Sequence, residues 1–108
     1  MTVNDLAQNS DFKAIALPCG EREINGVYIG DLLSWVMGRA SCDDAWITIM
    51  TNVNVLAVAS LADTSCVILA EGVSLEQDVI DTALDKGINI LASDMSAYEI
   101  AVALSNAI

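Results

Sequence analysis

The sequence predicts one α/β domain over residues 1–108, with a mainly parallel sheet, helices packed on it, and three consecutive strand–helix units after an N-terminal segment. Short apolar runs alternate with longer segments of helical periodicity, which favours parallel strands joined by right-handed crossovers. The chain is also 55% hydrophobic but only 5% aromatic. A core of Val, Ile, Leu and Ala is typical of a parallel sheet covered on both faces.

The three strand–helix units occupy the C-terminal part of the chain. Strands are expected at residues 46–50, 66–70 and 88–91, and helices from about 52–63, 75–86 and 96–107. Ser74 with Gln77 and Ser96 with Glu99 have the spacing of capping boxes at two helix starts, and Gly87 has the position of a helix stop.

The N-terminal half is less regular. Thr2, with Asp5 three positions later, predicts the N-cap of a brief helix. Strands are expected at 13–17 and 27–29, and Gly30-Asp31 opens a helix that ends at Arg39. The apolar residues expected to form the buried stripe of this helix are Leu32, Leu33, Trp35, Val36 and Met37.

The charge balance excludes two classes of partner. Four Lys and Arg against fifteen Asp and Glu give a net charge of −11. Nucleic acids and anionic membranes bind clustered basic residues, so we expect neither as a partner. Residues 45–62 form an uncharged stretch of membrane-span length, but two amides at its centre, Asn52 and Asn54, disfavour a span.

The N-terminal segment and the cysteines indicate a cytoplasmic protein. Residues 1–10 are polar and lack the basic start of a signal peptide. Cys19, Cys42 and Cys66 are odd in number and widely spaced, which favours reduced thiols over a disulfide framework.

Residues for catalysis, metal binding or cofactor binding are not evident in the sequence. The chain has no histidine, which removes Ser-His and Cys-His arrangements and His-containing zinc sites. No phosphate-binding glycine motif is present. The acidic pairs Asp43-Asp44 and Glu21 with Glu23 could hold a divalent cation, but in so acidic a chain we expect them to be solvated. We therefore expect no enzyme activity, no metal and no cofactor.

Polar residues follow each strand of the regular half. Parallel sheets bind ligands beyond the carboxyl ends of their strands, so these residues are candidates for binding a small polar ligand. They are Thr51, Asn52, Asn54, Glu71, Gly72, Ser93 and Asp94. Helix capping is the alternative role for them. A small metal-dependent enzyme using Asn52, Glu71 and Asp94 is the alternative function.

The helix expected at 52–63 is apolar on nearly every side. One side can pack on the sheet, and the other then needs a cover. A homodimer would supply it, and the residues expected at the interface are Val55, Val58, Ala59 and Ala62. In the alternative, the N-terminal segment covers the helix and the protein is a monomer.

The regular half resembles the DRTGG domain family, whose members are similar to the N-terminal domain of HPr kinase. The residues that carry the resemblance are AWITIMTNVNVLAVASLADTSCVILAEGV and KGINILASDMSAYEIAVAL, and the match runs from about residue 26 to 104. The opening GVYIGDLLSWVMG resembles a stand-alone subgroup encoded beside iron-only hydrogenase and signalling proteins of anaerobic bacteria. The resemblance implies a regulatory or interaction module that is commonly dimeric. Such a module binds a second copy of itself, a partner enzyme or a signalling protein.

Two turns depart from the family pattern. Residues 51–54 provide no arginine where the family has a G-D-R type turn. Ala70-Glu71-Gly72 places a carboxylate in the position of the family's T-G-G turn. Any anion contact made by the family turn would be lost here.

Overall fold

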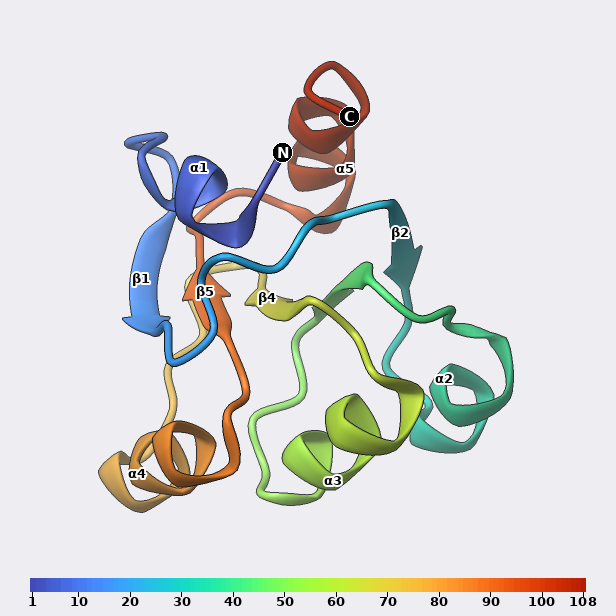
Figure 1. The fold of residues 1–108 in the computed structure, drawn as a ribbon, viewed down its shortest axis with the longest axis vertical. Helices are drawn as coiled ribbons and strands as arrows, with labels where there is room; N and C mark the ends of the chain where they lie inside the picture. The colour runs from blue at the N-terminus through green and yellow to red at the C-terminus, as the bar shows by residue number, and fades with distance from the viewer.

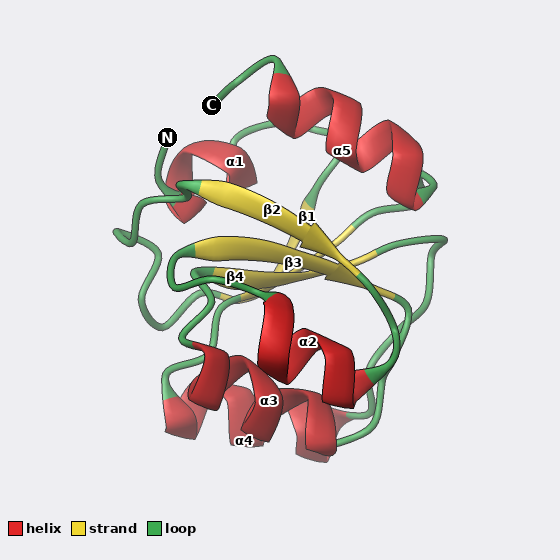
Figure 2. Cartoon of the chain, turned by 90° about the vertical axis from the view of Figure 1, so that its right-hand side faces the viewer, coloured by secondary structure: helices red, strands yellow, loops and turns green.

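The computed structural model describes residues 1–108 as one sheet between two layers of helices. The strands are β1 (Lys13–Ala16), β2 (Gly26–Ile29), β3 (Asp44–Thr48), β4 (Cys66–Leu69) and β5 (Ile90–Ala92). The helices are α1 (Val3–Ala7), α2 (Leu33–Arg39), α3 (Asn54–Ala62), α4 (Gln77–Lys86) and α5 (Ala97–Ser105). Helices α2, α3 and α4 cover one face of the sheet, and α1 and α5 cover the other (Figures 1 and 2).

The sheet has the strand order β1-β5-β4-β3-β2. Strands β2, β3, β4 and β5 run parallel, and β1 pairs with β5 in the antiparallel direction. The three C-terminal strand–helix units are present as expected, so the predicted mainly parallel α/β fold is confirmed. Both edge strands come from the less regular N-terminal half.

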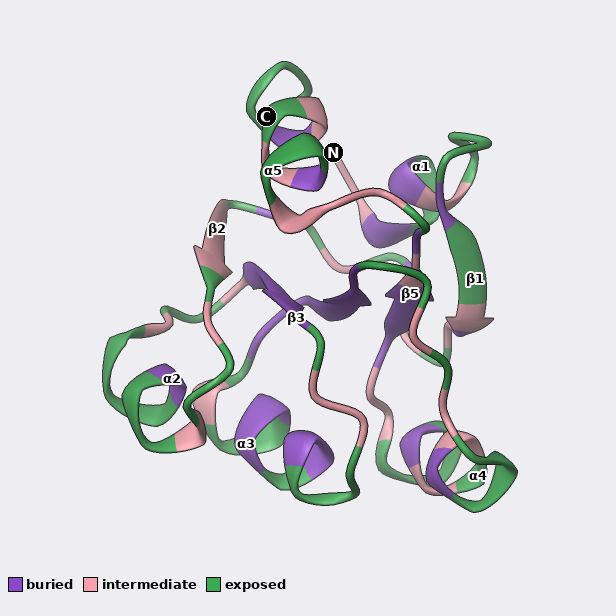
Figure 3. Cartoon of the chain, turned by 180° about the vertical axis from the view of Figure 1, so that it is seen from behind, coloured by how far each residue is buried: buried purple, intermediate pink, exposed green.

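The centre of the sheet is buried on both faces (Figure 3). Successive residues of β4 point to opposite layers: Cys66 and Ile68 pack with α1 and α5, and Val67 and Leu69 pack with α2, α3 and α4. Trp46 on β3 is fully buried in the second layer. Burying such a side chain stabilises the fold by about 1.5–3 kcal/mol, which is why these strands read as unbroken apolar runs.

Two predicted helix starts are confirmed and a third is wrong. Thr2 with Asp5 and Ser96 with Glu99 form capping boxes at α1 and α5. Helix α4 instead begins at Gln77 after Glu76, with no side-chain cap. The Gln77 side chain donates to Asp81 one turn later (2.9 Å), so it does not turn back to cap the helix start. Gly87 ends α4 in the left-handed conformation, as expected.

The stripe predicted to be buried on α2 is mostly exposed. Val36 is fully buried and Leu33 half-buried, but Leu32, Trp35 and Met37 are 59%, 52% and 41% exposed. Helix α2 lies beside the edge strand β2, where the sheet is too narrow to cover more than one side of the helix (Figure 2).

Helix α3 is covered within the subunit. Val55, Val58 and Ala59 are at most 8% exposed and pack in the layer shared with α2 and α4, and Ala62 is half-buried. The reasoning that a second subunit must cover these side chains is therefore corrected. Its basis was periodicity alone, which did not include the packing of α2 against α3. The exposed side of α3 carries Ala57, Ser60 and Leu61.

Strand boundaries differ from prediction by up to two residues. Strand β3 starts at Asp44 rather than Trp46, and β5 ends at Ala92. None of the helices is both long and apolar enough to cross a membrane. The uncharged stretch at 45–62 is instead divided between β3 and α3.

Asn89 connects three segments just before β5. It is buried, and its Oδ1 accepts from the backbone N–H of Cys19 (2.9 Å). Its Nδ2 donates to the carbonyl oxygens of Cys19 (2.7 Å) and Ser65 (2.9 Å). One side chain therefore ties the loop after β1 to the start of β4.

We expect Asn89→Leu to lower the free energy of unfolding by about 3 kcal/mol, because it removes the side-chain partners of the half-buried Cys19 N–H and of the buried Ser65 carbonyl. Urea denaturation followed by circular dichroism measures the change. Asn106→Ala, at the exposed end of α5, is the control and should stay within about 0.5 kcal/mol of the wild type. An unchanged urea midpoint for Asn89→Leu would contradict this role.

Candidate functional site

The carboxyl ends of β3, β4 and β5 meet at one edge of the sheet. Because β1 is antiparallel, its amino end lies at the same edge, beside the end of β5. Lys13 pairs with Ala92 there. The candidate ligand edge therefore includes residues from the N-terminal half that precede or begin β1.

A hollow of about 380 Å³ lies at this edge, between the start of β1, the β4–α4 loop and the β5–α5 turn. Apolar walls come from all three parts, with Ile15, Leu69 and Val73 among them. Polar groups come from Lys13 and from five hydroxyl or carboxylate side chains, which are Ser10, Asp11, Ser74, Ser93 and Asp94. Its volume lies in the range of small-molecule sites, about 300–1,000 Å³.

A second hollow of about 440 Å³ lies between the β3–α3 and β4–α4 loops. Thr51, Asn52 and Val53 line one side, and Glu76 and Asp78 line the other. Its charged residues are both acidic. It has less apolar wall than the first hollow, which makes it the weaker candidate for an organic ligand.

The predicted ligand residues are thus divided between two hollows. Gly72, Ser93 and Asp94 line the first, whereas Thr51 and Asn52 line the second. The remaining two residues line neither hollow. They are Asn54 and Glu71.

Several of these polar groups also have local structural partners. Asn52 Oδ1 accepts from the backbone N–H of Asn54 at the start of α3 (2.9 Å). Ser93 Oγ accepts from the backbone N–H of Met95 (3.1 Å). Capping and turn formation therefore account for one interaction of each, and the Ser93 hydroxyl proton stays available as a donor.

The turn after β4 has a constrained backbone. Glu71 and Gly72 both have positive φ, 63° and 72°. Their N–H groups donate to the carbonyl oxygens of Met95 and Ser93, each at 2.9 Å. A Cβ on Gly72 would lie 3.0 Å from Asp94 Oδ1, so glycine lets the two loops approach closely and shape the first hollow.

Asp31 fixes the end of β3, a role that the sequence did not reveal. Its Oδ1 accepts from Thr48 Oγ1 (2.7 Å) and from the backbone N–H of Ile49 (3.0 Å). Trp46 Nε1 donates to the Gly30 carbonyl (2.8 Å) beside it. These bonds hold the β2–α2 loop against the ligand edge.

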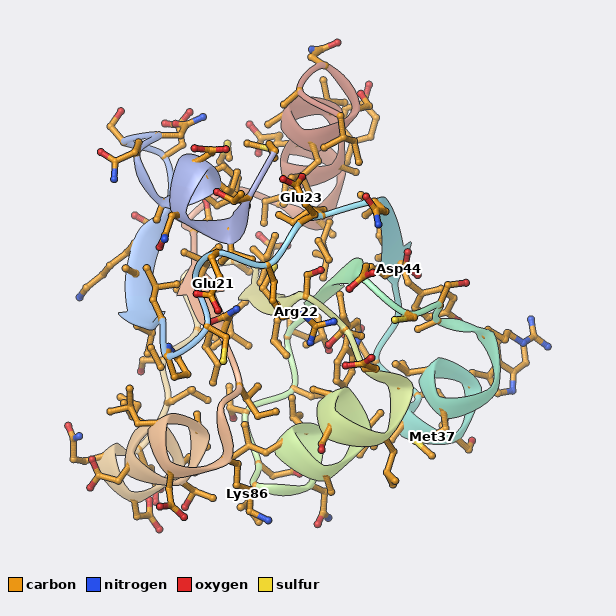
Figure 4. All side chains as sticks on the ribbon, in the orientation of Figure 1. Glu21, Arg22, Glu23, Met37, Asp44 and Lys86 are labelled. Atoms are coloured by element: carbon orange, nitrogen blue, oxygen red, sulfur yellow. The ribbon has the colours of Figure 1, made fainter.

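Lys13 is the one cation that lines either hollow. The chain has three other Lys or Arg residues. Arg22 is paired with carboxylates, Arg39 stacks on Trp35, and Lys86 is at the end of α4 (Figure 4). Lys13 forms no ion pair within the chain, so it is free to pair with a ligand.

A charged cluster lies at the opposite edge of the sheet. The guanidinium of Arg22 reaches toward the loops at the amino ends of β3 and β4 (Figure 4). It binds Asp43 Oδ1 at 2.7 Å and Asp63 Oδ1 at 3.0 Å. Both aspartates have positive φ, 67° and 56°. The cluster joins two such turns to the segment before β2, which is a structural role.

The acidic residues do not gather as a metal site would. No three His, Cys, Asp or Glu side chains are grouped to hold an ion. Asn52 lines a different hollow from Asp94, and Glu71 lines neither. The acidic pair at 43–44 is divided in role, because Asp43 binds Arg22 while Asp44 Oδ2 accepts from the Ser41 backbone N–H (2.8 Å).

Comparison with solved structures gives one informative likeness. The chain matches a crystal structure of the CBS and DRTGG domains of the regulatory region of Clostridium perfringens pyrophosphatase, complexed with the activator diadenosine tetraphosphate. The TM-score is 0.71 over 94% of this chain, with 12% sequence identity. The fold is DRTGG-like. The likeness covers 44% of that chain, less than half its length, and at this identity it concerns the fold alone.

No family model matches the sequence, and no curated protein is similar enough in sequence to be a relative. The structural likeness to the pyrophosphatase regulatory region confirms the DRTGG resemblance of the sequence at the level of the fold.

Cys42 is exposed but poorly activated. Its Sγ donates to Asp63 Oδ2 (3.2 Å), and this bond, together with the negative charges of Asp43 and Asp63, raises the pKa of the thiol. Burial raises the pKa of Cys66 to about 12. Neither residue has the lowered pKa of a reactive cysteine.

We expect Asp63→Asn to increase the alkylation rate of Cys42 by iodoacetamide at pH 8 several-fold. The substitution removes the carboxylate that favours the protonated thiol, so the thiol pKa falls and the thiolate fraction rises. The experiment uses a Cys19→Ser background, in which buried Cys66 stays unmodified until the protein unfolds. An equal or slower rate would show that Asp63 does not control this thiol.

Proposed function

We propose that this protein is a non-catalytic regulatory module of the cytoplasm. It is a homodimer that senses a small ligand in the hollow beside β1. Ligand binding is transmitted to a partner enzyme or signalling protein. The observation that carries this proposal is the hollow itself. It combines apolar walls with one unpaired cation, Lys13, in a chain of net charge −11. No nucleophile–base pair accompanies these groups.

The lining favours a ligand with a single anionic group and an apolar part. Lys13 can pair with the anion, and the Ser93 hydroxyl can donate to it. Aliphatic side chains of Ile15, Leu69 and Ile80 suit the apolar part. Asp11 and Asp94 add negative charge, which favours a ligand that also carries an amine and disfavours a polyanion.

The structural neighbour supports the regulatory class but not the same ligand. That regulatory region is complexed with diadenosine tetraphosphate. One lysine with two aspartates beside it is a poor counterpart for four phosphates. We therefore place the ligand among monoanionic or zwitterionic metabolites, such as amino acids with apolar side chains.

We expect a member of this class, added at about 100 times its dissociation constant, to stabilise the protein by ~2.7 kcal/mol, which corresponds to a melting-temperature rise of roughly 10 °C. Thermal denaturation against a panel of apolar amino acids and small carboxylates measures this. Diadenosine tetraphosphate, Mg²⁺ and Mn²⁺ are included as separate arms. A rise with the divalent ions alone would support the metal-dependent alternative and contradict our proposal.

Lys13→Gln should then weaken binding of the stabilising compound about tenfold or more, because the ligand anion loses its partner. Lys86→Gln is the matched control: it removes the same charge at the end of α4, outside both hollows. Equal affinity of the two variants would place the ligand elsewhere.

A further inference from the structure

The exposed large apolar side chains concentrate in one stretch of the chain. Seven of the eleven lie between the end of β2 and the end of α3. They are Ile29, Leu32, Trp35, Met37, Ile49, Val53 and Leu61. Leu32, Trp35 and Arg39 have the i, i+3, i+7 spacing that places them on one side of α2. The guanidinium of Arg39 stacks 3.8 Å from the centre of the Trp35 ring, which is still 52% exposed.

The two edges of the sheet differ in how they are protected. At one edge, β1 carries Lys13, has an irregular register between Ala14 and Ala16, and is followed closely by Pro18. Charges, bulges and proline are the features that keep edge strands from pairing with other chains.

The other edge has none of these features. Strand β2 pairs only with β3, and residues 24–30 contain no charge and no proline. Its outward backbone N–H and C=O groups are open to a further strand. Helix α2 lies beside it (Figure 2), and Trp35 and the N-cap residue Leu32 are exposed. An open edge and a helix with exposed apolar side chains are therefore neighbours.

The charge distribution favours a second copy of the same chain at this edge. A chain of net charge −11 repels its own copies over most of its surface. Strand β2 and helices α2 and α3 together carry one charged side chain, the cation Arg39. The loop between β2 and α2 adds one carboxylate, Asp31, whose Oδ1 accepts from Thr48 and Ile49. Two copies can approach here with the least repulsion between carboxylates.

We propose that β2 and α2 form the homodimer interface, in which a second copy pairs its β2 antiparallel to the first and packs its α2 against the first α2. This inference rests on the homodimer of the proposed function and moves its interface from the buried residues of α3 to this edge. A two-fold axis perpendicular to the sheet makes the two strands antiparallel and puts both α2 helices on the same face.

The size of a stable interface requires both elements. Such interfaces bury about 800 Å² of each partner, roughly a seventh of the 5405 Å² surface of this chain. A helix of seven residues cannot supply that area, whereas β2, α2 and the loops between them form one continuous side. Trp35 and Leu32 are the side chains that would be buried most deeply in this contact.

The test is the molar mass in solution of Trp35→Glu and Leu32→Glu, by sedimentation equilibrium. Each variant should raise the dimer dissociation constant about 100-fold or more, because the new carboxylate is buried once per copy. Leu84→Glu on α4 is the control, since Leu84 is similarly exposed (49%) and the charge change is identical. Circular dichroism checks that each variant is folded.

Amides of β2 should also exchange hydrogen more slowly in the dimer than in a monomeric variant.

Each result decides between defined outcomes. Monomeric Trp35→Glu or Leu32→Glu with a dimeric Leu84→Glu supports this interface. A dimeric wild type whose α2 variants stay dimeric overturns the interface and leaves the homodimer of the proposed function standing. A monomeric wild type at every concentration overturns both, without bearing on the ligand hollow.

Discussion

Burial of the central strands on both faces is the constraint from which the rest of this structure follows. All residues of β3 and β4 are buried, so helices must cover both sides of the sheet. Polar chemistry is then confined to the ends of the strands and to the outer strands. The loops at the carboxyl ends provide the two hollows, while the loops at the amino ends provide the Arg22 cluster. The candidate sites are therefore located by the packing of the core.

Sequence patterns predict most of the features that depend on neighbouring residues. The N-cap at Thr2, the capping box at Ser96 and the stop at Gly87 are confirmed. The equally local capping box expected at Ser74 is wrong, because Gln77 binds Asp81 instead. Three apolar runs likewise predict β3, β4 and β5, three of the four parallel strands. The polar residues after these strands were placed at the correct edge, because the direction of a parallel strand fixes where its ends lie.

What the sequence could not supply depends on contacts between distant segments. The antiparallel direction of β1 brings Lys13 to the ligand edge, and nothing near Lys13 in the sequence indicates that direction. The exposure of Trp35 depends on α2 lying beside an edge strand, whereas its apolar pattern alone indicated burial. The covering of Val55 and Ala59 likewise depends on neighbouring helices that periodicity does not reveal.

The irregular register of β1 affects how far a sheet of this kind can extend. Strand addition needs a regular, unobstructed ladder, and the interruption between Ala14 and Ala16, with Pro18 beyond it, does not offer one. Further strands are thereby disfavoured at this side, which leaves β2 as the edge open to pairing. A sheet with two open edges could extend into fibres, whereas the dimer proposed at β2 would be closed and finite.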